Sequence, residues 1–76
     1  MRLKRYGNLS GESGVEAYAF TPTSILVKFR DRDRPYEYSS TGRAGPRKVA
    51  RMKTLAAAGR GLSTYISRYA RDDYER

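Results

Sequence analysis

The sequence predicts a small α+β domain, in which three antiparallel strands are followed by two helices that pack on one face of the sheet (βββαα). Apolar and polar residues alternate in short segments between residues 15 and 39, which is typical of strands. After residue 46, apolar residues instead recur every three to four positions, which is typical of amphipathic helices. The links between the strand-like segments are short and favour a meander. A chain of 76 residues is long enough for one domain and too short for two.

The first strand is expected over residues 15–20, because this segment is rich in aromatic and β-prone residues. Strict alternation places Tyr18 and Phe20 on one face of this strand and Val15, with two alanines, on the other. Residues 21–24 should form a turn, because they combine a proline with hydroxyl side chains that bond locally.

The clearest strand is expected over residues 25–30. Its inward face would carry Ile25, Val27 and Phe29. A charged turn then leads to a third strand over residues 35–39, which would place Tyr36 and Tyr38 on one face. A proline at its first position suits the start of a strand or a sheet edge.

The first helix should begin at Pro46 and end at Gly59, since proline suits the first turn of a helix and glycine suits its end. Its apolar stripe consists of Val49, Met52, Leu55 and Ala56. A second helix is expected after Gly61. Its stripe consists of Leu62, Tyr65, Ile66 and Tyr69, and both tyrosines are expected in the core. Asp72 and Asp73 would lie at its C-terminal end, where carboxylates are unfavourable, so fraying is expected there.

Three regions follow from this pattern. Residues 1–14 are expected to form a flexible basic N-terminal segment, because residues 7–14 are rich in glycine and serine. Residues 15–71 would form the folded domain, and residues 72–76 would form a short acidic tail.

Composition excludes several classes of function. The chain has no cysteine and no histidine, which rules out thiolate or histidine metal sites and Ser-His or Cys-His catalysis. Asp31 and Asp33 alternate with arginines that would oppose a bound cation. We therefore expect a non-catalytic protein without a metal or another cofactor. No apolar run is long enough to span a membrane, and a cytoplasmic protein is expected.

Charge is the strongest signal in the sequence. Sixteen Lys and Arg residues against eight Asp and Glu residues give a net charge of +8. Between residues 38 and 71 the chain carries eight cations and no carboxylate. These cations are Arg43, Arg47, Lys48, Arg51, Lys53, Arg60, Arg68 and Arg71. Such an unbalanced half predicts a positive field that attracts polyanions.

The predicted nucleic-acid interface is a basic helical face that contacts the phosphate backbone. The arginines expected to bind phosphate are Arg43, Arg47, Arg51, Arg60 and Arg68. With four to six such contacts, the logarithm of the binding constant should fall with the logarithm of salt concentration at a slope of roughly −3 to −5. In the alternative interpretation, these cations only solubilise a polar helix face.

Two further features bear on this interface. Tyr36 and Tyr38 would stack on bases if exposed, and would belong to the core, under the helices, if buried. The loop at residues 42–46 leads into a helix N-terminus, where a single phosphate contact competes with the simpler interpretation of a connecting loop.

The ordered set of motifs resembles the KTSC domain, a small module found at the C-terminus of some lysyl-tRNA synthetases and as a separate bacterial or phage protein. The residues that carry the resemblance are the alternating strand Ile25-Leu26-Val27-Lys28-Phe29, the Tyr36-Glu37-Tyr38 strand, Pro46 with Val49, and Ala57-Ala58-Gly59 before Leu62 and Ile66. Ala57 stands where that family usually has serine. The resemblance implies the fold, and it favours RNA over DNA as the ligand.

A second hypothesis belongs to a different class. The small core and an exposed sheet edge would suit a protein-interaction module that forms a homodimer or docks to an acidic protein partner. Attraction to a membrane surface is not expected, because the apolar helical stripes are needed for the core.

Overall fold

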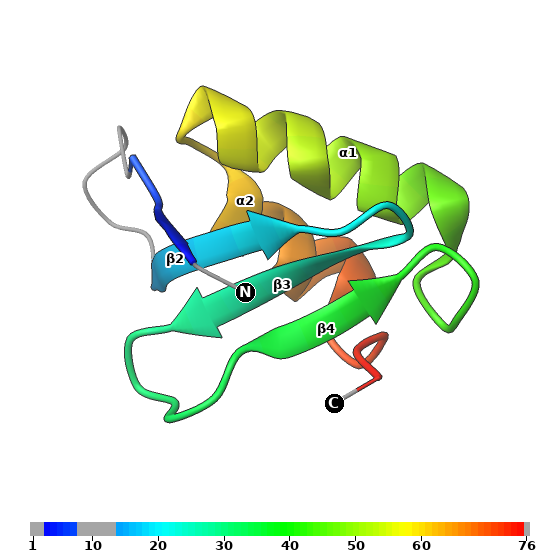
Figure 1. Cartoon of the computed structure of the whole chain (residues 1–76), viewed down its shortest axis with the longest axis horizontal. Coiled ribbons are helices and arrows are strands. Elements are labelled where there is room, and N and C mark those ends of the chain that lie inside the picture. Colours follow the sequence, from blue (N-terminus) through cyan, green and yellow to red (C-terminus); the bar gives the residue numbers. More distant parts are fainter. Residues whose placement is uncertain (1–2, 8–13, 76) are drawn as a thin grey trace.

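A computed structural model of the chain describes residues 3–7 and 14–75. Four antiparallel strands form one sheet in the order β1-β2-β3-β4, and the helices pack behind it (Figure 1). The strands are β1 (Lys4–Arg5), β2 (Val15–Phe20), β3 (Ser24–Phe29) and β4 (Tyr36–Ser39). The helices are α1 (Gly45–Ala58) and α2 (Leu62–Tyr65), and α2 continues as the π-helical turn η1 (Ile66–Ala70). The predicted α+β class is confirmed, but the sheet has four strands instead of three.

The additional strand lies within the segment that was expected to be flexible. Residues Lys4 and Arg5 pair with Tyr18 and Ala17 of β2. The neighbouring Tyr6 is only 6% exposed, and its hydroxyl accepts a hydrogen bond from the buried backbone N–H of Leu62 at 3.2 Å. Residues 3–7 therefore belong to the folded domain. The loop predicted between Gly7 and Gly14 falls on residues 8–13, which lie outside the described residues.

One prediction about the face of a side chain is wrong. Val15 was expected on the face opposite Tyr18, but it is 1% exposed and pairs with Phe29 of β3. The pairing register shifts between Val15 and Ala17. Such a bulge adds one residue to the strand, so the side chains before it change faces. Val15 consequently joins the core.

The core lies between the inner face of the sheet and the helices. Ile25, Val27, Met52 and Leu62 are fully buried. Helix α1 ends as predicted at Gly59, which adopts a left-handed conformation at φ 78°. The backbone N–H groups of Gly59 and Arg60 then bond back to carbonyls of the last turn, in the pattern of a Schellman motif.

The second helix departs from its predicted stripe. Leu62 and Ile66 are buried as expected and Tyr65 is half-buried, but Tyr69 is 56% exposed, and Ala70 is fully buried in its place. The π-helical turn η1 explains this difference, because a π-helix has more residues per turn than an α-helix. Ala70, four positions after Ile66, therefore returns to the core in place of Tyr69, which is three positions after Ile66.

Candidate nucleic-acid interface

Arginine side chains form most of the free positive charge in the part of the chain that the structure describes. All ten arginines in residues 3–7 and 14–75 are exposed, and none of them forms an ion pair with a carboxylate. They are Arg5, Arg30, Arg32, Arg34, Arg43, Arg47, Arg51, Arg60, Arg68 and Arg71. We call this set the arginine surface. Its guanidinium groups keep their forked N–H donors available for a ligand.

The lysines behave differently, because three of the four are bound within the protein. Lys48 forms an ion pair with Asp73 at 2.7 Å, and Lys28 forms one with Glu16 at 3.4 Å. The Lys53 ammonium donates a hydrogen bond to the carbonyl oxygen of Thr21 at 2.7 Å. Lys48 and Lys53 therefore serve the fold, although the sequence alone counted them with the free cations.

The five arginines predicted to bind phosphate do not form one continuous patch. Arg47 and Arg51 lie on successive turns of α1, and Arg43 lies in the loop that precedes this helix. Arg60 follows the other end of α1, and a rise of about 1.5 Å per residue places it roughly 20 Å along the helix axis from Arg47. Arg68 lies on η1. The structure therefore groups Arg43, Arg47 and Arg51 around the start of α1 and places Arg60 beyond its far end.

A cavity near η1 brings aromatic rings together with cations. It has a volume of about 190 Å³ and lies between the β3–β4 loop and η1. Its lining consists of Phe29, Asp31, Arg32, Tyr36, Tyr38, Ile66, Ser67 and Arg71. Clefts for drug-sized ligands usually measure about 300–1,000 Å³, so this cavity suits a single ring. We call it the hairpin–η1 cavity.

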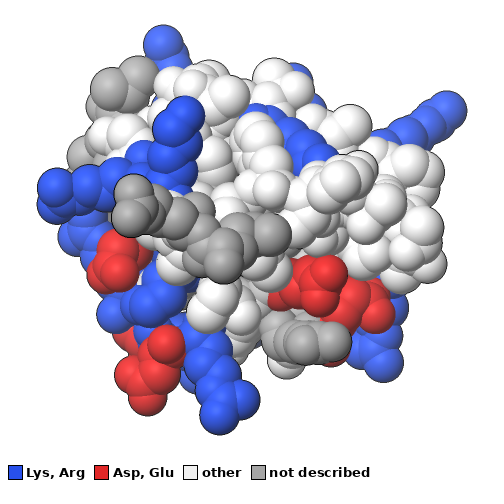
Figure 2. Space-filling model, viewed as in Figure 1, with Lys and Arg blue, Asp and Glu red and all other residues white. Residues whose placement is uncertain are grey.

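Sequence reasoning missed the contribution of the β3–β4 loop. Arg30, Arg32 and Arg34 alternate with two aspartates, so this stretch looked neutral. In the structure these arginines form no ion pairs with the described acidic residues. Figure 2, which views the sheet side, shows Lys and Arg gathered with some acidic residues at the end formed by β1 and the β3–β4 loop. The signal in the sequence was three arginines immediately before the Tyr36-Glu37-Tyr38 strand.

A larger cavity, of about 720 Å³, is lined by Arg5, Tyr6, Gly7, Val15, Glu16 and Arg30. Its one aromatic ring is nearly buried, and the Tyr6 hydroxyl already accepts the Leu62 N–H. This cavity offers cations but no free ring for stacking.

The two candidate stacking tyrosines differ in accessibility. Tyr38 is 1% exposed, and burial raises the pKa of its hydroxyl well above the ordinary value. It is therefore a core residue and cannot present a ring face to a base. Tyr36 is half-buried, with Phe29 edge-on at 5.7 Å and Tyr74 tilted against it at 4.6 Å between ring centroids. Of the two, only Tyr36 remains a candidate for base stacking.

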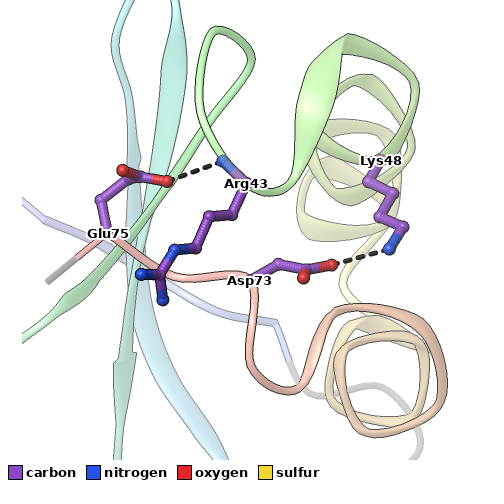
Figure 3. A network of polar contacts seen from close by, with 4 residues as sticks. All are labelled: Arg43, Lys48, Asp73 and Glu75. Atoms are coloured by element: carbon purple, nitrogen blue, oxygen red, sulfur yellow. Dashed lines mark hydrogen bonds and ion pairs between the residues drawn. The ribbon is translucent and has the colours of Figure 1, made fainter.

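The acidic segment, residues 72–75, packs back on the domain instead of fraying (Figure 3). The Glu75 carboxylate accepts a hydrogen bond from the backbone N–H of Arg43 at 2.8 Å, and Asp73 binds Lys48. The backbone N–H of Glu75 donates to the Glu37 carbonyl of β4 at 2.6 Å. The 42–46 loop, where a phosphate contact was considered, thus has one of its N–H groups bonded to a carboxylate of the chain itself.

Within residues 3–7 and 14–75, no cluster of three or more acidic side chains could hold a metal ion. In the same part of the chain, no helix has the length and apolar character needed to cross a bilayer.

No protein-family model matches the chain, and no curated protein and no solved structure matches it either. The resemblance to the KTSC domain therefore stays a prediction.

Proposed function

We propose that this chain is a small non-catalytic module that binds single-stranded nucleic acid, RNA in preference to DNA, through the arginine surface. The supporting observation is that all ten described arginines are exposed and unpaired, whereas three of the four lysines are bonded within the protein. A positive surface of this kind attracts polyanions and releases their counterions on binding.

Arginine suits phosphate because its planar guanidinium donates two parallel N–H groups to two oxygens. An arginine that is already paired with a carboxylate would have to exchange one anion for another. The free arginines on α1 and beside the hairpin–η1 cavity need no such exchange. They therefore support backbone binding more directly than net charge does.

A single strand is favoured over a duplex by the aromatic lining beside the cations. Arg32 and Arg71 line the same cavity as Phe29 and Tyr36. Unpaired bases can be splayed out and stacked on such rings, whereas the bases of a duplex are already stacked on each other. The preference for RNA comes from the resemblance to the KTSC domain.

Fluorescence anisotropy with labelled oligonucleotides of about 12 nucleotides, within the range of sites on small single-strand binders, tests the proposal. We expect binding at low micromolar protein in low salt, in the order single-stranded RNA, single-stranded DNA, duplex. R47Q/R51Q should weaken binding to all sequences, and the matched R47K/R51K variant, which keeps both charges, should weaken it less. Absence of binding to every oligonucleotide under these conditions would end the proposal.

The alternative of a protein-interaction module receives less support. It relied on an exposed sheet edge, but the backbone N–H of Glu75 bonds to the Glu37 carbonyl on β4, and β1 pairs with β2 at the other edge. Sedimentation of the free chain separates the two hypotheses, because a stable dimer that buries Arg47 and Arg51 would favour self-association.

A further inference from the structure

Three successive residues of the acidic segment make three different contacts with the domain. The Asp73 carboxylate lies 2.7 Å from the Lys48 ammonium. The Tyr74 ring packs against Tyr36 with 4.6 Å between centroids. Figure 3 shows the first contact and the hydrogen bond from Arg43 to the Glu75 carboxylate. The segment therefore presents an anion, a flat ring and a second anion to the side of the domain that carries Lys48, Tyr36 and Arg43.

We propose that this surface, formed by Tyr36, Arg43 and Lys48, is a subsite for one nucleotide of a single strand, and that the acidic segment occupies it until nucleic acid displaces the segment. The base would stack on Tyr36 in place of Tyr74. The two phosphates that flank the base would replace the carboxylates at Lys48 and Arg43. This inference rests on the proposed function and specifies where one unit of the ligand binds.

The acidic segment and a nucleic-acid strand carry their anionic and flat groups in the same order. A nucleic-acid strand places an anionic phosphate on each side of every base, and the segment places a carboxylate on each side of Tyr74. Alternate residues of an extended chain lie about 7 Å apart, which is comparable with the spacing of successive phosphates along a strand. Phosphate also accepts hydrogen bonds from backbone N–H groups and from ammonium groups, as these carboxylates do.

The contacts that hold the segment are replaceable. The Lys48–Asp73 pair is partly exposed, with 39% and 26% of the two side chains accessible, so solvent and salt weaken it. The Tyr74 ring is 37% exposed. The Arg43 guanidinium points away from the Glu75 carboxylate in Figure 3, and no ion pair links them, so this side chain remains available for a phosphate.

Charge-matched variants test the inference by anisotropy with the same labelled single-stranded RNA. D73N/E75Q removes the two docked carboxylates. D33N/D72N removes two exposed carboxylates for which no ion pair is found. We expect D73N/E75Q to bind RNA at least about fivefold tighter than the wild-type chain, which is the size of a typical coupling between two ligands of one protein. We expect D33N/D72N to change the RNA affinity less than about twofold.

The aromatic contact is tested in the same way. Y74A should also tighten binding, because it vacates the face of Tyr36, whereas Y74F keeps the ring and should leave the affinity unchanged. Thermal melts of each variant show that it is folded. In an NMR titration of the wild-type chain, the Arg43 amide resonance should shift on addition of RNA.

Each outcome decides between distinct conclusions. RNA binding by the wild-type chain, with D73N/E75Q no tighter than D33N/D72N, would refute the subsite and leave the proposed function standing. Failure of every variant to bind RNA would refute the proposed function and this inference with it. Dimerisation of D73N/E75Q in sedimentation, without tighter RNA binding, would assign the vacated surface to a second protein segment instead of a nucleotide.

Discussion

Tyr6→Phe tests whether the N-terminal strand is part of the fold. The Tyr6 hydroxyl accepts the backbone N–H of Leu62, the first residue of α2, at 3.2 Å. The preceding Gly61 has no side chain that could cap this helix. Leu62 is fully buried, so water cannot easily take the place of the lost hydroxyl. Tyr6 therefore acts as a cap that is supplied from the other end of the chain.

The expected loss of stability follows from leaving the buried backbone N–H of Leu62 without an acceptor, which costs about 1–3 kcal/mol. We expect Y6F to lower the free energy of unfolding by about 1–2 kcal/mol, and in a domain of this size each kcal/mol lowers Tm by roughly 4–8 °C. Y6A also removes the ring, which packs edge-on against Tyr18 at 6.4 Å, and should cost about 3–5 kcal/mol.

Urea denaturation followed by circular dichroism measures both losses, with an unchanged dependence on urea showing that the folded state is the same. Tyr69→Phe is the matched control, because its ring is 56% exposed, and it should change stability by less than about 0.5 kcal/mol. If Y6F is as stable as Y69F, then Tyr6 does not cap α2 and residues 3–7 are not integrated in the domain.

Two other predictions concern the tyrosine core and the acidic segment. Burial raises the pKa of the Tyr38 hydroxyl, so the folded state favours its neutral form. The stabilisation that this preference provides is present below about pH 10 and is lost as the pH rises above 10. Between about pH 10 and pH 11 the wild-type chain should lose about 1 kcal/mol more than Y38F in urea denaturation, because the unfolded tyrosine is only half ionised at pH 10, and equal losses would contradict the assignment. Gly42→Ala places a methyl group against the Glu75 carboxylate. It should displace this carboxylate and speed hydrogen exchange at the Arg43 amide, so unchanged protection would show that the contact does not hold the segment.

The local sequence pattern was sufficient to predict the elements in which the spacing of apolar residues is unbroken. Ile25 and Val27 are buried on the predicted face of β3, and α1 ends at Gly59 as its sequence indicates. These features depend on side-chain alternation and on one residue that adopts positive φ without strain. Both properties can be read from a short stretch of sequence.

The differences arise where a distant contact or a change of period decides the outcome. Residues 4–5 form a strand only because β2 offers them a free edge, and nothing local in two basic residues signals this pairing. The bulge after Val15 and the π-helical turn before Ala70 each shift a periodic pattern by one position.

The candidate interface likewise combines features that the local sequence predicts with features that only the fold decides. The sequence identified the uncompensated positive charge, but it could not separate the paired lysines from the free arginines. Asp73 lies far along the chain from Lys48, so their ion pair depends on the fold. Likewise, the repulsion expected between the helix end and Asp73 is outweighed by contacts that only the folded chain provides.

The salt dependence of RNA binding tests most directly whether the unpaired arginines bind phosphates. Each phosphate contact to a single strand contributes about 0.7 to the slope, so four to six contacts predict a slope of about −3 to −4 for the wild-type chain. Loss of two contacts in R47Q/R51Q should make the slope shallower by about 1.4. A wild-type slope near zero, or an identical slope in R47Q/R51Q, would contradict phosphate binding by these residues.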